Sequence, residues 1–174
     1  MICYIGLGSN LSEPLVQLQN ALDSIKKEPE LQLLKVSSFY QSKALVLPDA
    51  PPQNDYINAA AMLETVLTAE QLLQRLHKIE AAQGRERNEK WGARTLDLDI
   101  LLYGESKIQT EKLIIPHAQI QYRNFVIHPL FEIAGAIDVP GLGDLSSMAK
   151  AMPWDGLKKL NNPIYNNSYN HNYE

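Results

Sequence analysis

The sequence predicts a mixed α/β (α+β) fold in which helices pack on the faces of an antiparallel sheet. Apolar residues recur at helical spacing in two stretches, residues 15–25 and 72–79, and segments of strand-like composition flank each stretch. Along the chain the order is strand, helix, strand, strand, helix, strand, followed by irregular additions. This order is the split βαβ pattern of ferredoxin-like folds.

The first half of this pattern starts with a buried strand at Met1–Leu7, which is expected to end in a turn at Gly6–Asn10. Ser12 is expected to cap the first helix, with Glu13 and Pro14 in its first turn. The helix is followed by a predicted strand at 31–42 and a proline-containing loop at 45–55.

The second half starts with a predicted strand at 56–67. Thr68 and Gln71 then form a capping box, which marks the start of the second helix, and Gly84 ends that helix. A polar, charged loop follows. The remaining expected elements are a strand at 95–103, one or two short strands within 108–115, a helix at 125–134 and a short helix at 144–152.

Length and composition predict a single domain over residues 1–160 and a polar tail, rich in Asn and Tyr, over residues 161–174. The net charge of -4 and the sequence pI of about 5.6 argue against broad nucleic-acid binding, which leaves a basic footprint. Neither a signal peptide nor a membrane-spanning stretch is evident, so a cytoplasmic location without membrane contact is expected. The only cysteine, Cys3, lies in an apolar run and predicts a buried, inert thiol.

Two aspartates in the predicted strand at 95–103 are the first candidates for chemistry. Asp97 and Asp99 are two residues apart, so they point to the same face, roughly 6–7 Å from each other. Leu96, Leu98, Ile100 and Leu102 are expected to point to the other face and into the core. Mg²⁺ typically takes one or two carboxylates together with substrate phosphates and water. Alone, however, the Asp-x-Asp pattern fits a solvated strand face better.

A basic segment precedes these carboxylates and favours phosphate handling. It contains Arg85, Arg87, Lys90 and Arg94, and guanidinium groups offer a planar fork of donors to phosphate oxygens. Phosphoryl transfer needs cations and metal ions that hold the phosphates and absorb charge. Trp91 lies in the same segment and fits either a lid or an anchor of the loop.

Further candidates lie on both sides of this strand. His117 and Arg123 could contact phosphate, although a lone histidine is more often structural. Tyr56 and Phe125 could sandwich a flat heterocycle whose edge is read by the amide of Asn58. Core packing is the alternative for both aromatic residues.

Together these segments resemble 6-hydroxymethyl-7,8-dihydropterin pyrophosphokinase, an enzyme of folate biosynthesis. The resemblance covers about residues 1–160. The motifs that carry it, in chain order, are Gly6-Leu7-Gly8-Ser9-Asn10-Leu11, Val36-Ser37-Ser38-Phe39-Tyr40, Asp55-Tyr56-Ile57-Asn58-Ala59-Ala60, Ile79-Glu80, Gly84-Arg85, Trp91-Gly92-Ala93-Arg94-Thr95-Leu96-Asp97-Leu98-Asp99-Ile100, Pro116-His117, Arg123-Asn124-Phe125 and Pro129-Leu130-Phe131-Glu132. The Arg-Thr-Leu-Asp-Leu-Asp-Ile stretch is the most specific of them.

The resemblance implies a monomer of ferredoxin-like fold that transfers the β,γ-pyrophosphate of ATP to the hydroxymethyl group of the dihydropterin and releases AMP. It also implies two Mg²⁺ ions, bound by Asp97 and Asp99. It assigns catalysis to Arg85, Arg94, Asp97 and Asp99. It assigns the ATP site to Glu80, Arg85, Trp91, Arg94, Ile100, His117 and Arg123.

For the pterin site, the resemblance implies Ser42, Leu45, Tyr56, Asn58, Trp91, Asp97 and Phe125. The sequence departs from the family pattern at His77, where Gln is usual, and at Ala118, where an aromatic residue is common.

Two other functions stay open from the residues alone. A different metal-dependent phosphoryl or nucleotidyl transferase of this fold would keep Asp97 and Asp99 without needing Tyr56, Asn58 and Phe125 together. A ferredoxin-like RNA-binding module would display aromatic residues on a basic sheet face, which the acidic pI and the two strand carboxylates disfavour.

Overall fold

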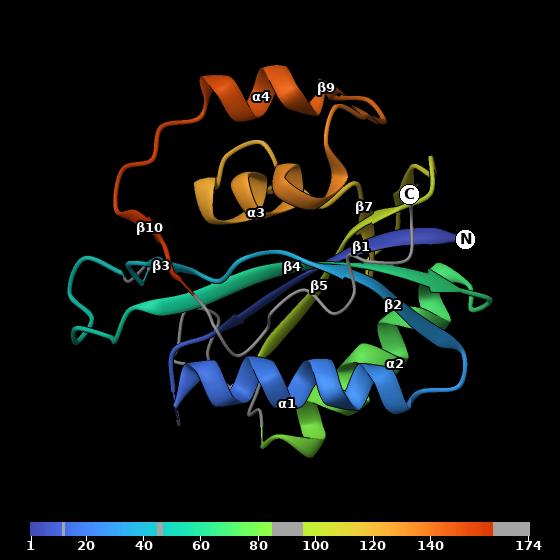
Figure 1. Cartoon of the computed structure of the whole chain (residues 1–174), viewed down its shortest axis with the longest axis horizontal. Coiled ribbons are helices and arrows are strands. Elements are labelled where there is room, and N and C mark those ends of the chain that lie inside the picture. Colours follow the sequence, from blue (N-terminus) through green and yellow to red (C-terminus); the bar gives the residue numbers. More distant parts are fainter. Residues whose placement is uncertain (12, 45–46, 85–95, 162–174) are drawn as a thin grey trace.

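A computed structural model describes residues 1–11, 13–44, 47–84 and 96–161 of the chain. These ranges form an antiparallel six-stranded sheet, two separate strand pairs and four helices (Figure 1). The sheet contains β1 Ile2–Ser9, β2 Leu31–Val36, β3 Tyr40–Ser42, β4 Tyr56–Thr65, β5 Asp97–Tyr103 and β10 Leu157–Lys159. The helices are α1 Pro14–Lys27, α2 Ala69–Ala82, α3 Asn124–Ala134 and α4 Leu145–Ala151. The strand pairs are β6 Ile108–Gln109 with β7 Ile114–Ile115, and β8 Asp138–Val139 with β9 Gly143–Asp144.

The strand order confirms the predicted ferredoxin-like antiparallel sheet. It runs β10-β3-β4-β1-β5, and β2 also pairs with β4. β4 is long enough to pair with β3 over residues 56–58 and with β2 over residues 61–65. The single strand expected at 31–42 is therefore two strands. Between the two strands, the backbone N of Ala60 donates a hydrogen bond to the hydroxyl of Ser37 at 2.8 Å. In a regular strand pair, a backbone carbonyl would accept this hydrogen bond.

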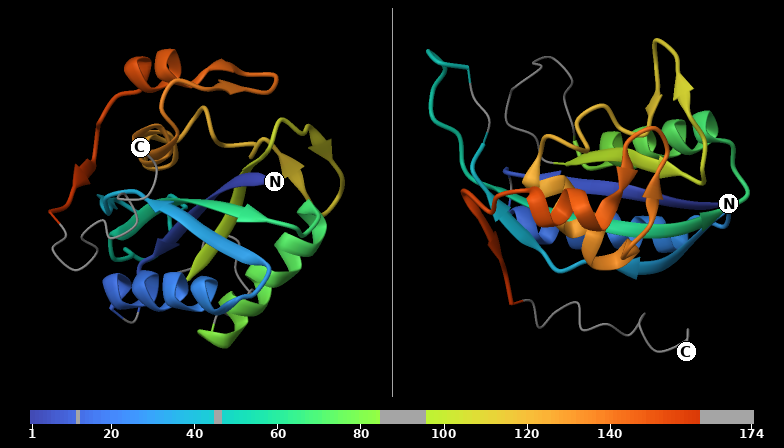
Figure 2. Two further views of the ribbon diagram at one scale, coloured as in Figure 1. Left: turned by 45° about the vertical axis from the view of Figure 1, so that its right-hand side comes forward. Right: turned by 90° about the horizontal axis from the view of Figure 1, so that it is seen from above.

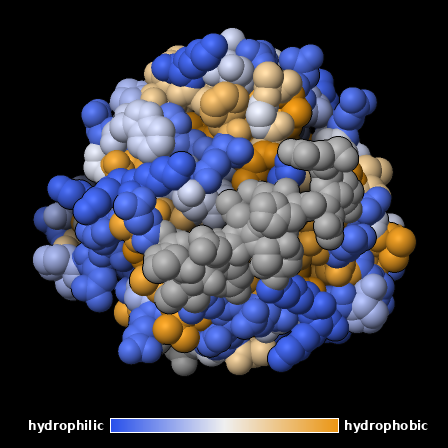
Figure 3. Space-filling view, viewed as in Figure 1, coloured by the Kyte–Doolittle hydropathy of each residue, from blue (hydrophilic) through white to orange (hydrophobic). Residues whose placement is uncertain are grey.

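Helices cover both faces of this sheet. α1 and α2 lie against one face, and α3 lies against the other with α4 packed on its outer side (Figures 1 and 2). On the side of the molecule seen in Figure 3, hydrophobic residues form small separate patches among hydrophilic ones.

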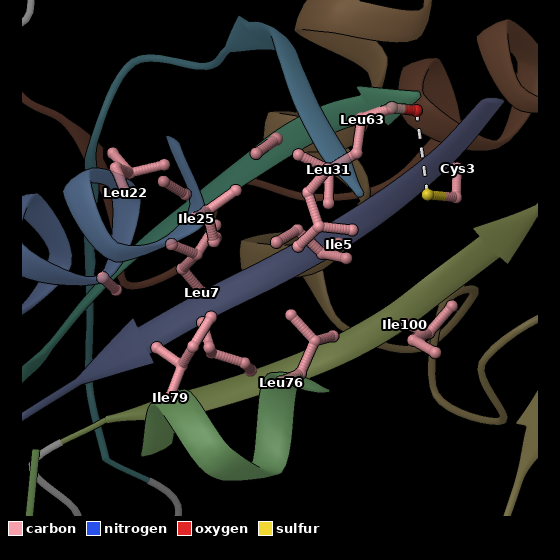
Figure 4. Close-up of a cluster of buried hydrophobic side chains, with 14 of the residues drawn as sticks. Cys3, Ile5, Leu7, Leu22, Ile25, Leu31, Leu63, Leu76, Ile79 and Ile100 are labelled. Carbon is pink, nitrogen blue, oxygen red and sulfur yellow. Dashed lines mark hydrogen bonds between the residues drawn. The ribbon is translucent and has the colours of Figure 1, made fainter. Parts of the chain in front are cut away.

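The larger core fills the space between the sheet and the pair α1 and α2. Figure 4 shows Leu22 and Ile25 of α1 in this core together with Ile5 of β1 and Leu76 of α2. Cys3 closes the far end of this core, and its thiol donates to the carbonyl of Leu63 at 3.7 Å. Burial raises the pKa of the Cys3 thiol to about 12, which agrees with the predicted inert role.

A β-bulge in β5 changes which residues face this core. Ile5 pairs with Ile100 and Tyr4 pairs with Leu102, so Leu101 has no partner on β1. Leu98 and Ile100 point into the core with α1 and α2 as predicted, but Leu102 packs in the second core, beside Leu101 and against α3 and α4. The expectation that Leu102 shares a face with Ile100 was wrong because the bulge interrupts the alternation.

The helix ends were predicted with mixed success. Thr68 and Gln71 form both hydrogen bonds of the expected capping box. At α1 the residue that precedes the helix is Glu13, with a left-handed backbone (φ 58°) and no side-chain cap, so the expectation that Glu13 lies in the first turn was wrong. Ser12, the predicted cap, lies outside the residues that the structure describes. Pro14 is in the first turn as expected.

Two further boundaries differ from the prediction. β1 continues to Ser9, through the segment expected to turn. β10, which the sequence did not indicate, pairs with β3 at the edge of the sheet. Within the part of the chain that the structure describes, no helix is long and apolar enough to cross a membrane. The division into a 1–160 domain and a 161–174 tail stays a prediction.

Candidate active site

A pocket of about 300 Å³ opens on the face of the sheet that carries α3. Its floor comes from β1, β4 and β5, and its walls come from β3, the segment after β7 and the start of α3. The residues that line it are Gly6, Leu7, Gly8, Ser42, Lys43, Tyr56, Asn58, Ala59, Asp97, Asp99, Leu101, His117, Gln119, Arg123, Phe125 and Val126.

Two glycines of β1 leave the middle of this floor without side chains. Gly8 pairs with Asn58 on one side and with Asp97 on the other, and Gly6 pairs with Asp99. A Cβ at Gly8 would lie 3.3 Å from Oδ1 of Asn58. Every second residue of a strand normally points its side chain to the same face. Because Gly6 and Gly8 have no side chains, they leave a hollow between the Asn58 amide and the two carboxylates.

Asp97 and Asp99 form one side of the pocket, and alternation along β5 puts both on the same face as predicted. The side chain of Asp99 is 47% exposed, and its Oδ2 lies 4.0 Å from Nε2 of His117. Solvent and a ligand can therefore both reach this carboxylate.

Two hydrogen bonds position His117 beside these carboxylates. Its backbone N donates to the carbonyl of Leu101 at 3.0 Å, and its Nδ1 accepts from the backbone N of Gln119 at 3.1 Å. Since Nδ1 accepts, the neutral ring carries its proton on Nε2, which faces Asp99. Burial and the nearby Arg123 lower the pKa of His117, against the opposing effect of Asp97. His117 is thus a neutral donor near a cation and two carboxylates.

The opposite side of the pocket combines aromatic rings and an amide. Asn58 is buried, and its Nδ2 donates to Oγ of Ser42 at 2.8 Å and to the carbonyl of Tyr40 at 3.3 Å. These two acceptors set the orientation of the amide, so its oxygen is the end that lies over Gly8. The rings of Tyr56 and Phe125 also line the pocket.

Arg123 and Phe125 lie close together in the lining of the pocket. The guanidinium carbon of Arg123 lies 5.6 Å from the centre of the Phe125 ring, within cation–π distance. One wall therefore offers a positive charge close to an aromatic face.

The arrangement can hold a flat heterocycle with polar edges next to a group that needs cations and carboxylates. Similarity to known proteins identifies the family to which the chain belongs. The family model for 7,8-dihydro-6-hydroxymethylpterin-pyrophosphokinase matches residues 4–135. The chain belongs to this family.

Curated relatives agree with this assignment. The chain is 48% identical over 158 residues to the 2-amino-4-hydroxy-6-hydroxymethyldihydropteridine pyrophosphokinase of Haemophilus influenzae, which covers 91% of this chain and 97% of that protein. It is 42% identical over 157 residues to the enzyme of the same name from Pseudomonas aeruginosa, covering 90% of this chain and 95% of that protein.

Solved structures share the fold at much lower identity. The crystal structure of an HPPK-DHPS protein in complex with substrates superposes with a TM-score of 0.71 at 11% identity, over 91% of this chain and 46% of that chain. An HPPK-DHPS triple mutant of Plasmodium falciparum with pteroate gives a TM-score of 0.67 at 11% identity, with the same coverage. This chain thus spans just under half the length of these proteins, and the likeness shows the fold alone.

Family membership defines the activity. The enzyme is a diphosphotransferase that transfers pyrophosphate from ATP to 6-hydroxymethyl-7,8-dihydropterin in folate biosynthesis. The pocket brings together most of the described residues that the sequence predicted for this pyrophosphokinase: Ser42, Tyr56, Asn58, Asp97, Asp99, His117, Arg123 and Phe125.

Two residues predicted for the ATP site lie elsewhere. Glu80 is 1% exposed, and its Oε1 accepts a hydrogen bond from the backbone N of Leu98 at 2.8 Å. The side chain of Ile100 is packed in the core with α1 and α2. The Ile100 side chain lies on the face of β5 opposite the pocket, because Ile100 is next to Asp99 in the strand. Glu80 belongs to α2 and contacts the backbone of β5, outside the pocket lining. A part in ATP binding stays a prediction for both.

Other predicted residues lie outside those that the structure describes, namely Leu45, Arg85, Trp91 and Arg94. Conversely, the pocket contains residues that sequence reasoning missed, including Lys43, Gln119, Gly6 and Gly8. Two signals could have found some of them. Lys43 directly follows the predicted Ser42, and the glycines alternate along β1 with Ile5 and Leu7.

Proposed function

We propose that this single pocket binds both substrates of the transfer, with ATP phosphates and Mg²⁺ at Asp97 and Asp99 and the pterin at Asn58. The observation that carries the proposal is the row Asn58–Gly8–Asp97 across three neighbouring strands. It sets an amide and a carboxylate on either side of a position without a side chain. A substrate lying over Gly8 would reach both.

The donor set of this pocket fits magnesium. Among the described residues, no group of three or more His, Cys, Asp or Glu could enclose a metal ion. Two carboxylates on an open strand face instead suit an ion that takes its remaining ligands from phosphates and water. Two Mg²⁺ ions, held by Asp97 and Asp99, would neutralise the phosphate oxygens and hold them in line with the attacking hydroxyl.

His117 and Arg123 are proposed to contact the phosphates. Arg123 offers a fixed charge and several donors. His117 offers a proton on Nε2 and adds no charge of its own, because its lowered pKa keeps it neutral. A neutral donor next to Asp99 can bind a phosphate oxygen without competing for the carboxylates that bind the metal.

The pterin is proposed to lie between Tyr56 and Phe125, with one edge against Asn58. Both rings line the pocket, and stacking of aromatic faces suits a flat bicyclic heterocycle. The Oδ1 atom of Asn58 would accept from a pterin N–H, since the Asn58 Nδ2 already donates to Tyr40 and Ser42. The hydroxymethyl group would then extend over Gly8 toward the aspartates.

The remaining proposals rest on the sequence. Arg85, Arg94 and Trp91 are proposed to complete the phosphate side of the site, with Arg85 and Arg94 in catalysis. Leu45 is proposed to complete the pterin side, and Glu80 and Ile100 the ATP site. A monomer in the cytoplasm is the expected working form.

One assay tests the proposed function. The protein is incubated with ATP, Mg²⁺ and 6-hydroxymethyl-7,8-dihydropterin, and nucleotide products are separated. AMP in equal amount to the pterin diphosphate is expected, and it should vanish without Mg²⁺. Formation of ADP would point instead to the transfer of a single phosphoryl group, and the absence of both products from a folded protein would contradict the proposal.

A further inference from the structure

The carboxylate of Glu132 connects α3 to the strand beside the amide end of the pocket. Its Oε1 accepts hydrogen bonds from the backbone N of Ser38 at 2.9 Å and from the hydroxyl of Ser38 at 2.6 Å. Its Oε2 accepts a hydrogen bond from the hydroxyl of Tyr40. One side chain therefore bonds both to the segment that enters β3 and to the first residue of β3.

β3 in turn holds the amide of Asn58. Tyr40 and Asn58 are partners in the β3–β4 register. The carbonyl of Tyr40 and the hydroxyl of Ser42 are the two acceptors of the Asn58 Nδ2. Both acceptors belong to β3, so a displacement of β3 would turn the amide that faces the pocket.

β3 is only three residues long, and its position depends on its neighbours. β10 pairs with its outer edge, the Trp154 ring packs on the Tyr40 ring with centroids 6.1 Å apart, and Nζ of Lys159 lies 3.8 Å from Oε1 of Glu132. Burial and the adjacent Glu132 carboxylate raise the pKa of Tyr40, which keeps its hydroxyl protonated and donating. Glu132 is the acidic group at which α3, β3 and β10 meet.

We propose that Glu132 is a positioning residue for pterin recognition, which holds β3 so that Tyr40 and Ser42 aim the Asn58 amide into the pocket. This inference rests on the proposed role of Asn58 in binding the pterin. Glu132 lies outside the pocket lining that the described residues form, so it acts through Tyr40 and not by contact with the substrate.

The test compares the KM for the dihydropterin with the KM for ATP. Glu132→Ala is expected to raise the pterin KM about tenfold, the loss typical of a hydrogen-bonded charged group, and to change kcat and the ATP KM less than about twofold. Glu132→Gln keeps one side-chain oxygen that can accept hydrogen bonds, so its pterin KM should lie between those of the wild type and Glu132→Ala. Tyr40→Phe removes only the hydroxyl and should have a smaller effect. Glu111→Ala, an exposed acid in the β6–β7 turn, is the matched control and should match the wild type.

A double-mutant cycle separates this coupling from a general loss of structure. In the Asn58→Ala background, Glu132→Ala should raise the pterin KM by less than about twofold, because the amide that Glu132 positions is absent. Additive effects, an equal rise of both KM values, or an unchanged pterin KM in Glu132→Ala would overturn the inference. If Glu132→Ala fails to fold, Glu132→Gln and Tyr40→Phe carry the same comparison.

The Asn58→Ala variant alone distinguishes the two levels of the proposal. If it leaves the pterin KM unchanged, the proposed role of Asn58 is wrong, and the role of Glu132 falls with it. If it raises the pterin KM while Glu132→Ala does not, only the inference on Glu132 is contradicted.

Discussion

The two faces of the sheet are built from the same strands and have opposite character. Toward α1 and α2, β1 presents Cys3, Ile5 and Leu7, none more than 3% exposed. Toward α3, the same strand presents Gly6 and Gly8, and the space above them is the pocket. β5 repeats the contrast, with Leu98 and Ile100 in the core and the two aspartates in the pocket. Because side chains alternate along a strand, the residues that pack the core and the residues that line the pocket lie on opposite sides of the same backbone.

The site therefore depends on the absence of side chains at Gly6 and Gly8 as well as on the side chains that are present. A filled face excludes water and stabilises the fold. A face with two glycines in its central strand gives room for a substrate between the aspartates proposed to bind metal and the amide proposed to bind the pterin. Substitutions on the two faces should therefore change different observables.

The largest expected effect is on the pocket face. Asp97→Ala should lower turnover by at least about a thousandfold, because a lost metal ligand removes several kcal/mol of charge stabilisation in the transition state. The melting temperature should stay close to that of the wild type, since the carboxylate lies in an open pocket. Asp138→Asn, an exposed acid in β8, is the control for the loss of one charge. Turnover within tenfold of the wild type would contradict the metal-binding role.

The core face should respond in the opposite way. Leu76 is fully buried on α2, so Leu76→Ala should lower the free energy of unfolding by about 2–5 kcal/mol through lost burial and a residual cavity. Chemical denaturation measures this change. Activity per folded molecule, assayed well below the melting temperature, should stay within a few-fold of the wild type. A loss of activity as large as that of Asp97→Ala would show that the two faces are not separable.

The smallest expected effect concerns the space over Gly8 in the floor of the pocket. Gly8→Ala adds a methyl group 3.3 Å from Oδ1 of Asn58 and 3.7 Å from Cδ1 of Tyr56. Pterin affinity should fall roughly tenfold, because the crowded amide has to move, while stability changes little. Gly6→Ala is the comparison variant, and its loss of affinity should be smaller, since the three atoms nearest its Cβ all belong to the flexible side chain of Leu101, the closest at 3.4 Å. Direct pterin binding distinguishes the two variants, and equal affinities would mean that Gly8 does not shape the pterin site.

The parts of the fold that depend on residues close together in the sequence could be predicted. The capping box of Thr68 and Gln71 and the helical spacing of apolar residues depend on contacts within a few positions, and the structure confirms both. The common face of Asp97 and Asp99 follows from alternation alone. The family resemblance then joined these aspartates to Tyr56, Asn58 and Phe125, which are distant in sequence.

Features set by distant pairing could not be predicted in the same way. Leu102 was assigned to the wrong core because the bulge arises from the register between β1 and β5. β10 was missed because a three-residue strand acquires its structure from pairing with β3. Gly6 and Gly8 indicated a turn by composition, yet they continue β1 because both of its neighbours pair with it.

Metal binding to the pocket face is the most direct measurement of the central claim. Mn²⁺ in place of Mg²⁺, with a non-hydrolysable ATP analogue, can be counted by electron paramagnetic resonance. We expect two bound ions per wild-type chain, the loss of at least one in Asp97→Ala, and an unchanged count in Leu76→Ala. An equal count with equal affinity in the wild type and Asp97→Ala would contradict the assignment of the metal site to this face of the sheet.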